Sequence, residues 1–175
     1  MLEKMKTYAP HAMALFMAAI FLDSLRFKFT DHPKTQAIFG ALDGWAASLG
    51  APGLFAHTGL FSQNVIGSAE LVASVLLLAG ILPRFRHLQA LGALLGLAIM
   101  AVAVSFHLFT PLGIDPNRDG GGLFVAACVN LTFAVLLLAL FRRRELLTTV
   151  ERLAWALGPH EPLTTAAARP FPLRA

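Results

Sequence analysis

Six polar side chains lie within or at the ends of long apolar runs, and these are the residues whose types and spacing could do chemistry. They are Asp23, Arg26, Lys28, Glu70, His107 and Asn130. An ionisable side chain surrounded by hydrocarbon is costly, so each of these groups requires a partner or a water-filled cavity. A carboxylate, a guanidinium and an imidazole that meet there can exchange protons or hold a polar headgroup such as a quinone ring. We therefore predict a ligand-binding site made by these residues and assign no metal to it.

The depths of these residues along their apolar runs are similar. With about 1.5 Å of helix rise per residue, Asp23 lies roughly 9 Å, Glu70 roughly 15 Å, His107 roughly 5 Å and Asn130 roughly 12 Å from the outer end of its run. All four therefore fall in the outer half. Asp23 and Arg26 are spaced to pair along one helix, and Arg26 could instead reach Glu70.

The same polar residues are equally well explained as contacts that hold the helices together without any ligand. Hydrogen bonds between membrane helices are common, and each contributes about 0.6 kcal/mol. Both interpretations predict that the polar groups face other helices, because small residues share their helix faces and allow close approach. These small residues are Gly67 and Ser74 beside Glu70, Gly92 and Gly96 beside His107, and Gly122 and Ala126 beside Asn130.

The elements that must position these residues are indicated by composition. The chain is 57% hydrophobic and 14% charged, whereas about 25% charged residues is usual for soluble domains. Its apolar residues form four continuous runs, each about the 20 residues that a membrane-spanning helix needs. A membrane β-barrel would show shorter segments of alternating polarity. We predict an all-α integral membrane four-helix bundle within residues 1–141, with spans at about 10–29, 60–82, 88–110 and 122–141.

The positions of the basic residues predict the orientation. Eight of them flank one end of the spans: Lys4, Lys6, Arg84, Arg86, Arg142, Arg143, Arg144 and Arg152. The other end has four: Arg26, Lys28, Lys34 and Arg118. The positive-inside rule then places both termini in the cytoplasm of a bacterium, with the protein in the inner membrane. Because the basic residues lie at span ends and are not interleaved with aromatic residues, we expect no nucleic-acid partner.

Two further helices are predicted outside the spans. Ile38, Leu42, Trp45 and Leu49 recur at helical spacing in the first outer connection. This amphipathic helix either lies at the membrane interface or packs over the bundle as a lid, and the sequence leaves both open. Residues 142–158 are predicted to form a second amphipathic helix on the cytoplasmic surface, before a flexible tail at 159–175.

Several other chemistries are disfavoured. The single cysteine, Cys128, excludes a disulfide or a cysteine-based metal centre within one chain. Asp115 to Gly120 resembles half of a calcium loop but lacks the final glutamate, so we expect a turn. Pairing of His57 with His107, or of His11 with His87, is a possible ligand set for haem b. We do not expect haem, because three of these histidines lie at span ends, where a solvated histidine is ordinary.

Three short segments resemble the DoxX-like family of small four-helix membrane proteins, with local similarity to its YkgB-type members. They are Lys28-Phe29-Thr30, Ile66-Gly67-Ser68-Ala69-Glu70 and Ser105-Phe106-His107-Leu108-Phe109-Thr110-Pro111. The resemblance covers about residues 10–141. It implies that Gly67 and Glu70 correspond to the glycine and glutamate of the family's second helix, and Lys28 to its basic residue. Asp23, Arg26 and the longer outer connection depart from the family pattern.

The resemblance implies a redox association, since members are linked to thiosulfate:quinone oxidoreduction and to oxidative-stress complexes. We therefore expect an inner-membrane protein that binds a quinone-like or other small amphiphile in an outer-half pocket. Membership of a quinone-linked oxidoreductase is left open at this point. The alternative is a non-catalytic accessory or assembly subunit. The expected partners are membrane lipid, a quinone, and either other membrane subunits or further copies of the chain.

Overall fold

The computed structural model describes residues 2–157, which form six α-helices and two short helical segments. The tail predicted at 159–175 lies outside the described residues. No strand occurs in the described part, so the all-α prediction is confirmed. The elements in chain order are α1 (Leu2–Lys28), α2 (Pro33–Ser48), α3 (Gln63–Ala79), the 3₁₀ segment η1 (Pro83–Phe85), α4 (Arg86–Phe109), α5 (Gly122–Leu136), the π-helical segment η2 (Leu137–Phe141) and α6 (Arg143–Leu157).

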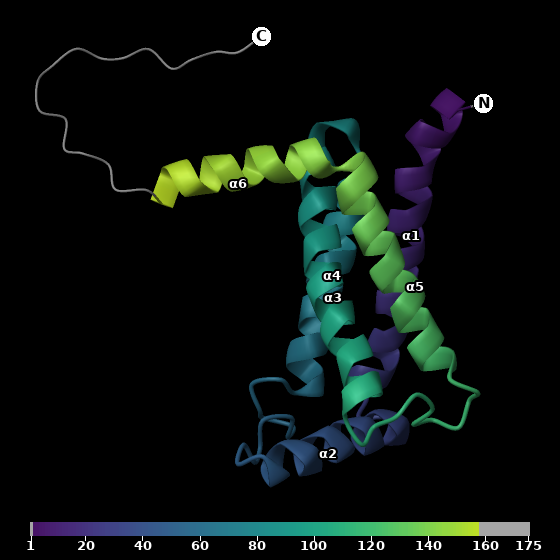
Figure 1. The fold of residues 1–175 in the computed structure, drawn as a ribbon, viewed down its shortest axis with the longest axis vertical. Coiled ribbons are helices and arrows are strands. Elements are labelled where there is room, and N and C mark those ends of the chain that lie inside the picture. Colours follow the sequence, from purple (N-terminus) through teal and green to yellow (C-terminus); the bar gives the residue numbers. More distant parts are fainter. Residues whose placement is uncertain (1, 158–175) are drawn as a thin grey trace, which may run out of the picture.

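Helices α1, α3, α4 and α5 lie side by side, and each runs opposite to the one before it (Figure 1). α1 and α4 each contact both α3 and α5. The shared core is rich in alanine, with Met17, Phe21 and Leu77 as its large buried side chains. Small residues allow this close packing: a Cβ atom on Gly92 would come within 2.8 Å of the Leu77 backbone nitrogen.

Three of these helices are long and apolar enough to cross a membrane, at Thr7–Lys28, Pro83–Phe109 and Gly122–Phe141. The chain therefore has the character of a membrane protein. The fourth predicted span, 60–82, is shorter in the structure, because its helix occupies only Gln63–Ala79. Ser62 ends the preceding loop and caps α3 by accepting a hydrogen bond from the backbone N–H of Val65. Gly80 ends the helix at the other side, where its Cα lies close to the backbone of Gln89.

The predicted helix in the first outer connection is present as α2, which crosses the end of the four packed helices (Figure 1). Its buried residues Leu42 and Ala46 pack with Phe55. Trp45 packs edge-on against Phe106 of α4, with 6.0 Å between ring centroids. Because its apolar side chains contact protein, α2 packs as the lid and not as a helix lying free at the interface.

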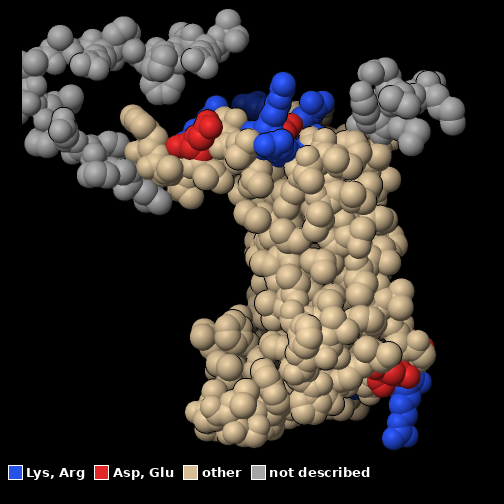
Figure 2. All heavy atoms as spheres, in the orientation of Figure 1, with Lys and Arg blue, Asp and Glu red and all other residues tan. Residues whose placement is uncertain are grey.

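At the opposite end, α5 continues into the π-helical turn η2, in which the Arg142 backbone N–H bonds to the carbonyl of Leu137. α6 then leaves the bundle sideways (Figure 1). Lys and Arg gather at this end, and the visible face between the two ends carries no charged side chain (Figure 2). This distribution matches the apolar belt that a membrane requires.

Candidate functional site

A buried ion pair joins α1 to α3 near the end covered by α2. Lys28 Nζ donates to both carboxylate oxygens of Glu70, at 2.8 and 3.0 Å. Ser24 Oγ donates to Glu70 Oε2 at 2.5 Å and accepts from Lys28 Nζ at 3.0 Å. The side chains of Lys28 and Glu70 are only 15% and 4% exposed. The carboxylate is therefore neutralised and hydrogen-bonded away from water, as a buried charge requires.

Helix geometry explains why these three side chains meet. Ser24 and Lys28 are four residues apart, so they lie on the same face of α1. Gly67 lies one turn before Glu70 in α3, and a Cβ atom there would come within 3.0 Å of the Phe29 ring and 3.4 Å of Lys28 Cδ. The missing side chain at Gly67 thus lets α1 approach α3 closely enough for the ion pair to form.

A second set of polar contacts lies at the start of α3, about two helical turns before Glu70. The amide of Gln63, which is 2% exposed, donates to the backbone carbonyl of Lys28 at 2.8 Å and to Asp31 Oδ1. Gln36 of α2 donates to Gln63 Oε1 at 2.7 Å. Asp31 also lies 3.4 Å from His57 Nε2. Hydrogen bonds thus connect the ends of α1 and α3 to the lid helix, and the Asp31 carboxylate also lies beside the exposed His57.

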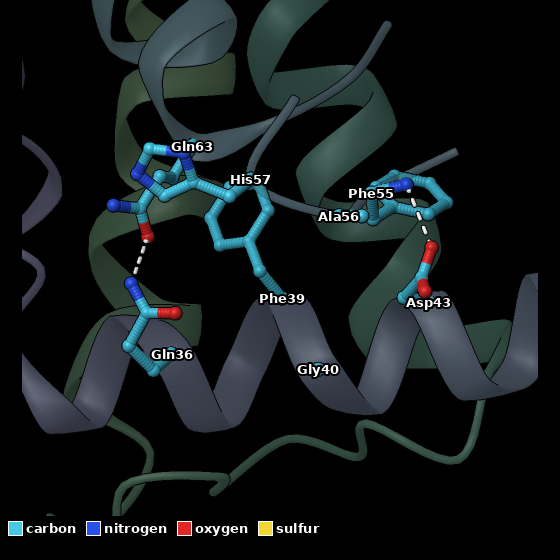
Figure 3. Close-up of a pocket in the computed structure, with 8 residues that line it drawn as sticks. All are labelled: Gln36, Phe39, Gly40, Asp43, Phe55, Ala56, His57 and Gln63. Carbon is cyan, nitrogen blue, oxygen red and sulfur yellow. Dashed lines mark hydrogen bonds between the residues drawn. The ribbon is translucent and has the colours of Figure 1, made fainter. Parts of the chain in front are cut away.

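These outer residues border a small cavity of about 160 Å³ between α2 and the segment that follows it (Figure 3). Phe39 and Phe55 form apolar walls, while Asp43 accepts a hydrogen bond from the Phe55 backbone N–H at 3.0 Å. The complete lining is Gln36, Phe39, Gly40, Asp43, Phe55, Ala56, His57 and Gln63. The cavity is a small, partly open hollow that combines two aromatic side chains with several polar groups, and it is smaller than the roughly 300–1,000 Å³ of most small-molecule sites.

Two of the predicted site residues face away from this region. Arg26 and Asp23 form an ion pair of 2.9 Å with each other, with side chains 69% and 58% exposed. The predicted pairing along one helix is confirmed, but the prediction that both point inward beside Glu70 is wrong. Arg26 and Lys28 are two residues apart and so project about 200° apart around α1, and only Lys28 has the phase that faces α3.

The remaining two predicted residues are buried but separate from the ion pair. His107 is in contact with Phe124, with ring centroids 5.5 Å apart, and its Nδ1 lies 2.6 Å from the carbonyl of Gly113. His107 thus fixes the loop after α4. Asn130 is fully buried in α5, and neither of its side-chain polar atoms has a hydrogen-bond partner. Among residues 2–157, no hydrogen bond joins either of them to Glu70.

Sequence reasoning missed Ser24 and Gln63 as site residues, and it considered His57 only as a haem ligand. Ser24 has a local signal, since it precedes Lys28 by one helical turn on the same face. Gln63 and His57 have no such local signal, because their partners come from segments distant in sequence.

Asp115 forms the expected turn: its carboxylate accepts backbone N–H bonds from Asp119 and Gly120. The bond from Asp119 is the main cause that lowers the pKa of Asp115. No group of three potential metal ligands occurs in the described chain.

Comparison with protein-family models, with curated proteins and with solved structures finds no match for this chain. The resemblance to the DoxX-like family therefore stays a prediction.

Proposed function

We propose that the chain is a bacterial inner-membrane protein in which α1, α3, α4 and α5 all cross the bilayer and both termini are cytoplasmic. Support comes from the alternating directions of the four helices and from the basic residues gathered at the α6 end. α3 rises only about 26 Å over its 17 residues. A short helix of this kind is accommodated by local thinning of the bilayer at modest cost.

We further propose that this protein binds the ring of a quinone-like amphiphile at its outer end, in a redox-associated role. The observation that carries this proposal is the cavity under α2, with its aromatic walls and its hydrogen-bonded connection to the Lys28–Glu70 pair. A volume of about 160 Å³ suits a single ring, because a cavity of about 150 Å³ binds benzene. The apolar tail would then extend along the lipid-facing side of the helices.

The residues around the cavity have distinct parts in this proposal. His57 can donate a hydrogen bond to one ring oxygen, while Phe39 and Phe55 enclose the ring. Gln36, whose amide donates to Gln63 and Asp31, lines the cavity beside them. The Lys28–Glu70 pair lies behind Gln63 and holds α1 and α3 in register. Arg26 and Asp23, being exposed, are assigned to the rim.

The second candidate is an accessory or assembly subunit of a larger membrane complex. It is favoured by the hydrogen bonding of the Glu70 carboxylate, which accepts bonds from Lys28 and Ser24 and therefore needs no ligand. It is also favoured by α6, whose apolar residues Leu147, Val150 and Leu153 are exposed away from the bundle.

Tryptophan fluorescence separates the two candidates. The chain has two tryptophans, so a Trp155→Phe background leaves Trp45 of the lid as the reporter. In nanodiscs, a short-chain ubiquinone should quench Trp45 saturably, and the combined Gln36→Ala and His57→Ala variant should weaken binding about tenfold. His87→Ala, an exposed histidine at the other end, is the control. Non-saturable quenching that is the same in all variants would leave the accessory subunit as the better assignment.

A further inference from the structure

A second buried cation lies at the opposite end of the molecule. Arg142, directly after η2, is 6% exposed. Its Nε donates to Gln89 Oε1 at 2.7 Å, and Nη1 donates to the Phe141 carbonyl at 3.3 Å. The π-helical turn causes this burial. It adds one residue to the turn, so Arg142 takes the inward position that a continuous α-helix would give to Phe141.

Among residues 7–156, whose side chains the structure describes, no carboxylate lies within ion-pair distance of this guanidinium. Burial lowers the pKa of Arg142, Glu145 of α6 opposes that effect, and the positive charge of Arg86 adds to it. Arg86 begins α4 three residues before Gln89, so the two residues lie on the same side of that helix. Glu145 supplies one negative charge against the two arginines. A buried cation without a paired anion is unfavourable, so this end of the bundle is electrostatically suited to an anionic ligand.

Two further polar atoms at this end also lack partners. Gln89 is fully buried in the first turn of α4, and its Nε2 donor has no hydrogen-bond acceptor. Nδ1 of His11 in α1 is likewise buried without a partner. Unpaired buried polar atoms are rare in native proteins, so the Gln89 donor is available to an acceptor that binds beside Arg142.

We propose that Arg142, Arg86 and Gln89 form a binding site for a phosphate group, supplied by an anionic phospholipid headgroup or by free phosphate. Phosphate oxygens accept the paired N–H bonds that a guanidinium offers, and they also accept from an amide. The site lies where α1, α4 and η2 meet, at the end of the apolar belt that carries the Lys and Arg residues (Figure 2). Basic sites between helices at that level of a membrane are suited to lipid phosphates.

Thermal unfolding of the full chain in neutral detergent tests this site. Phosphatidylglycerol should raise the Tm several degrees more than phosphatidylcholine does, with inorganic phosphate at equal concentration as the other arm. Arg142→Gln and Arg86→Gln should each remove at least half of that preference. Arg144→Gln is the matched control, since it removes the same charge from an exposed position nearby.

Each outcome of this experiment is decisive. Stabilisation by the lipid alone, or by phosphate alone, supports the site and identifies the source of the phosphate group. If Arg142→Gln fails to fold, the exposed Arg86→Gln still reports on the site. If Arg144→Gln instead reduces the lipid preference as much as Arg86→Gln does, that result would show a general effect of surface charge and would overturn the proposal. The proposal is also overturned if the unmodified protein shows no preference for phosphatidylglycerol or phosphate.

Discussion

The Lys28–Glu70 pair is a buried pair of opposite charges, and its energetics can be tested independently of any ligand. Glu70→Leu would leave a buried ammonium unpaired, so we expect it to lower the free energy of unfolding by about 3–5 kcal/mol. The double variant Lys28→Met with Glu70→Leu removes both charges and should recover most of that loss. Unfolding in detergent with increasing SDS measures both values.

Asp23→Ala provides the control for this pair. It breaks the exposed pair with Arg26, and we expect a loss below about 1 kcal/mol. A double variant as unstable as Glu70→Leu alone would contradict the prediction, because it would mean that the loss does not come from the unpaired lysine.

Gln63 and Asn130 are two buried amides in opposite situations. Gln63 makes hydrogen bonds to Lys28, Asp31 and Gln36, whereas Asn130 makes none with its side chain. Gln63→Ala leaves the Lys28 backbone carbonyl without its side-chain donor and removes the bonds to the exposed Asp31 and Gln36, so we expect a loss of about 1–3 kcal/mol. Asn130→Ala removes an unsatisfied group and should cost less than about 1 kcal/mol or be stabilising. Equal losses in the same SDS titration would show that Asn130 has a partner, such as a bound ligand.

The contact between α3 and α4 depends on glycine, which gives a prediction at the scale of the helix. A Cβ atom on Gly92 would lie 2.8 Å from the Leu77 backbone nitrogen and 3.0 Å from the Ala73 carbonyl oxygen. Backbone atoms cannot move aside as a flexible side chain can, so Gly92→Ala should destabilise the protein by about 1–3 kcal/mol. Gly40→Ala in α2 meets nothing within 4 Å. It should stabilise the protein by about 0.5–1 kcal/mol through helix propensity, and a loss at Gly40 equal to that at Gly92 would contradict the packing argument.

The topology of the whole molecule is tested by cysteine labelling. A Cys128→Ala background allows single cysteines to be introduced at Asn117, in the loop before α5, and at Arg84, in the turn before α4. A membrane-impermeant maleimide applied to intact cells should label the Asn117→Cys variant. It should label Arg84→Cys only after the cells are permeabilised. Labelling of both sites from outside would contradict the proposal, because α4 would then not separate them across the membrane.

Much of this architecture follows from the sequence alone. Apolar runs and helical periodicity are local properties, so they predicted the all-α class, the outer helix α2, the helix α6 and the buried faces that carry Gly67, Glu70 and Gly92. They also predicted that His107 and Asn130 would be buried. The physical reason is that a helix repeats every 3.6 residues, so small and polar residues at that spacing must share one side.

Only the tertiary structure decided which polar groups meet. Lys28 pairs with Glu70 while Arg26 points outward, because that choice depends on the rotation of α1 against α3. Gln63, Gln36 and His57 converge because α2 folds back over the bundle end. Arg142, predicted as a surface charge, is buried because one π-helical turn changes the phase of the last residues of its helix. These outcomes depend on contacts between segments distant in sequence and on a local change in helical register. The hydrophobic periodicity of a single apolar run predicts neither the contacts nor the change of register.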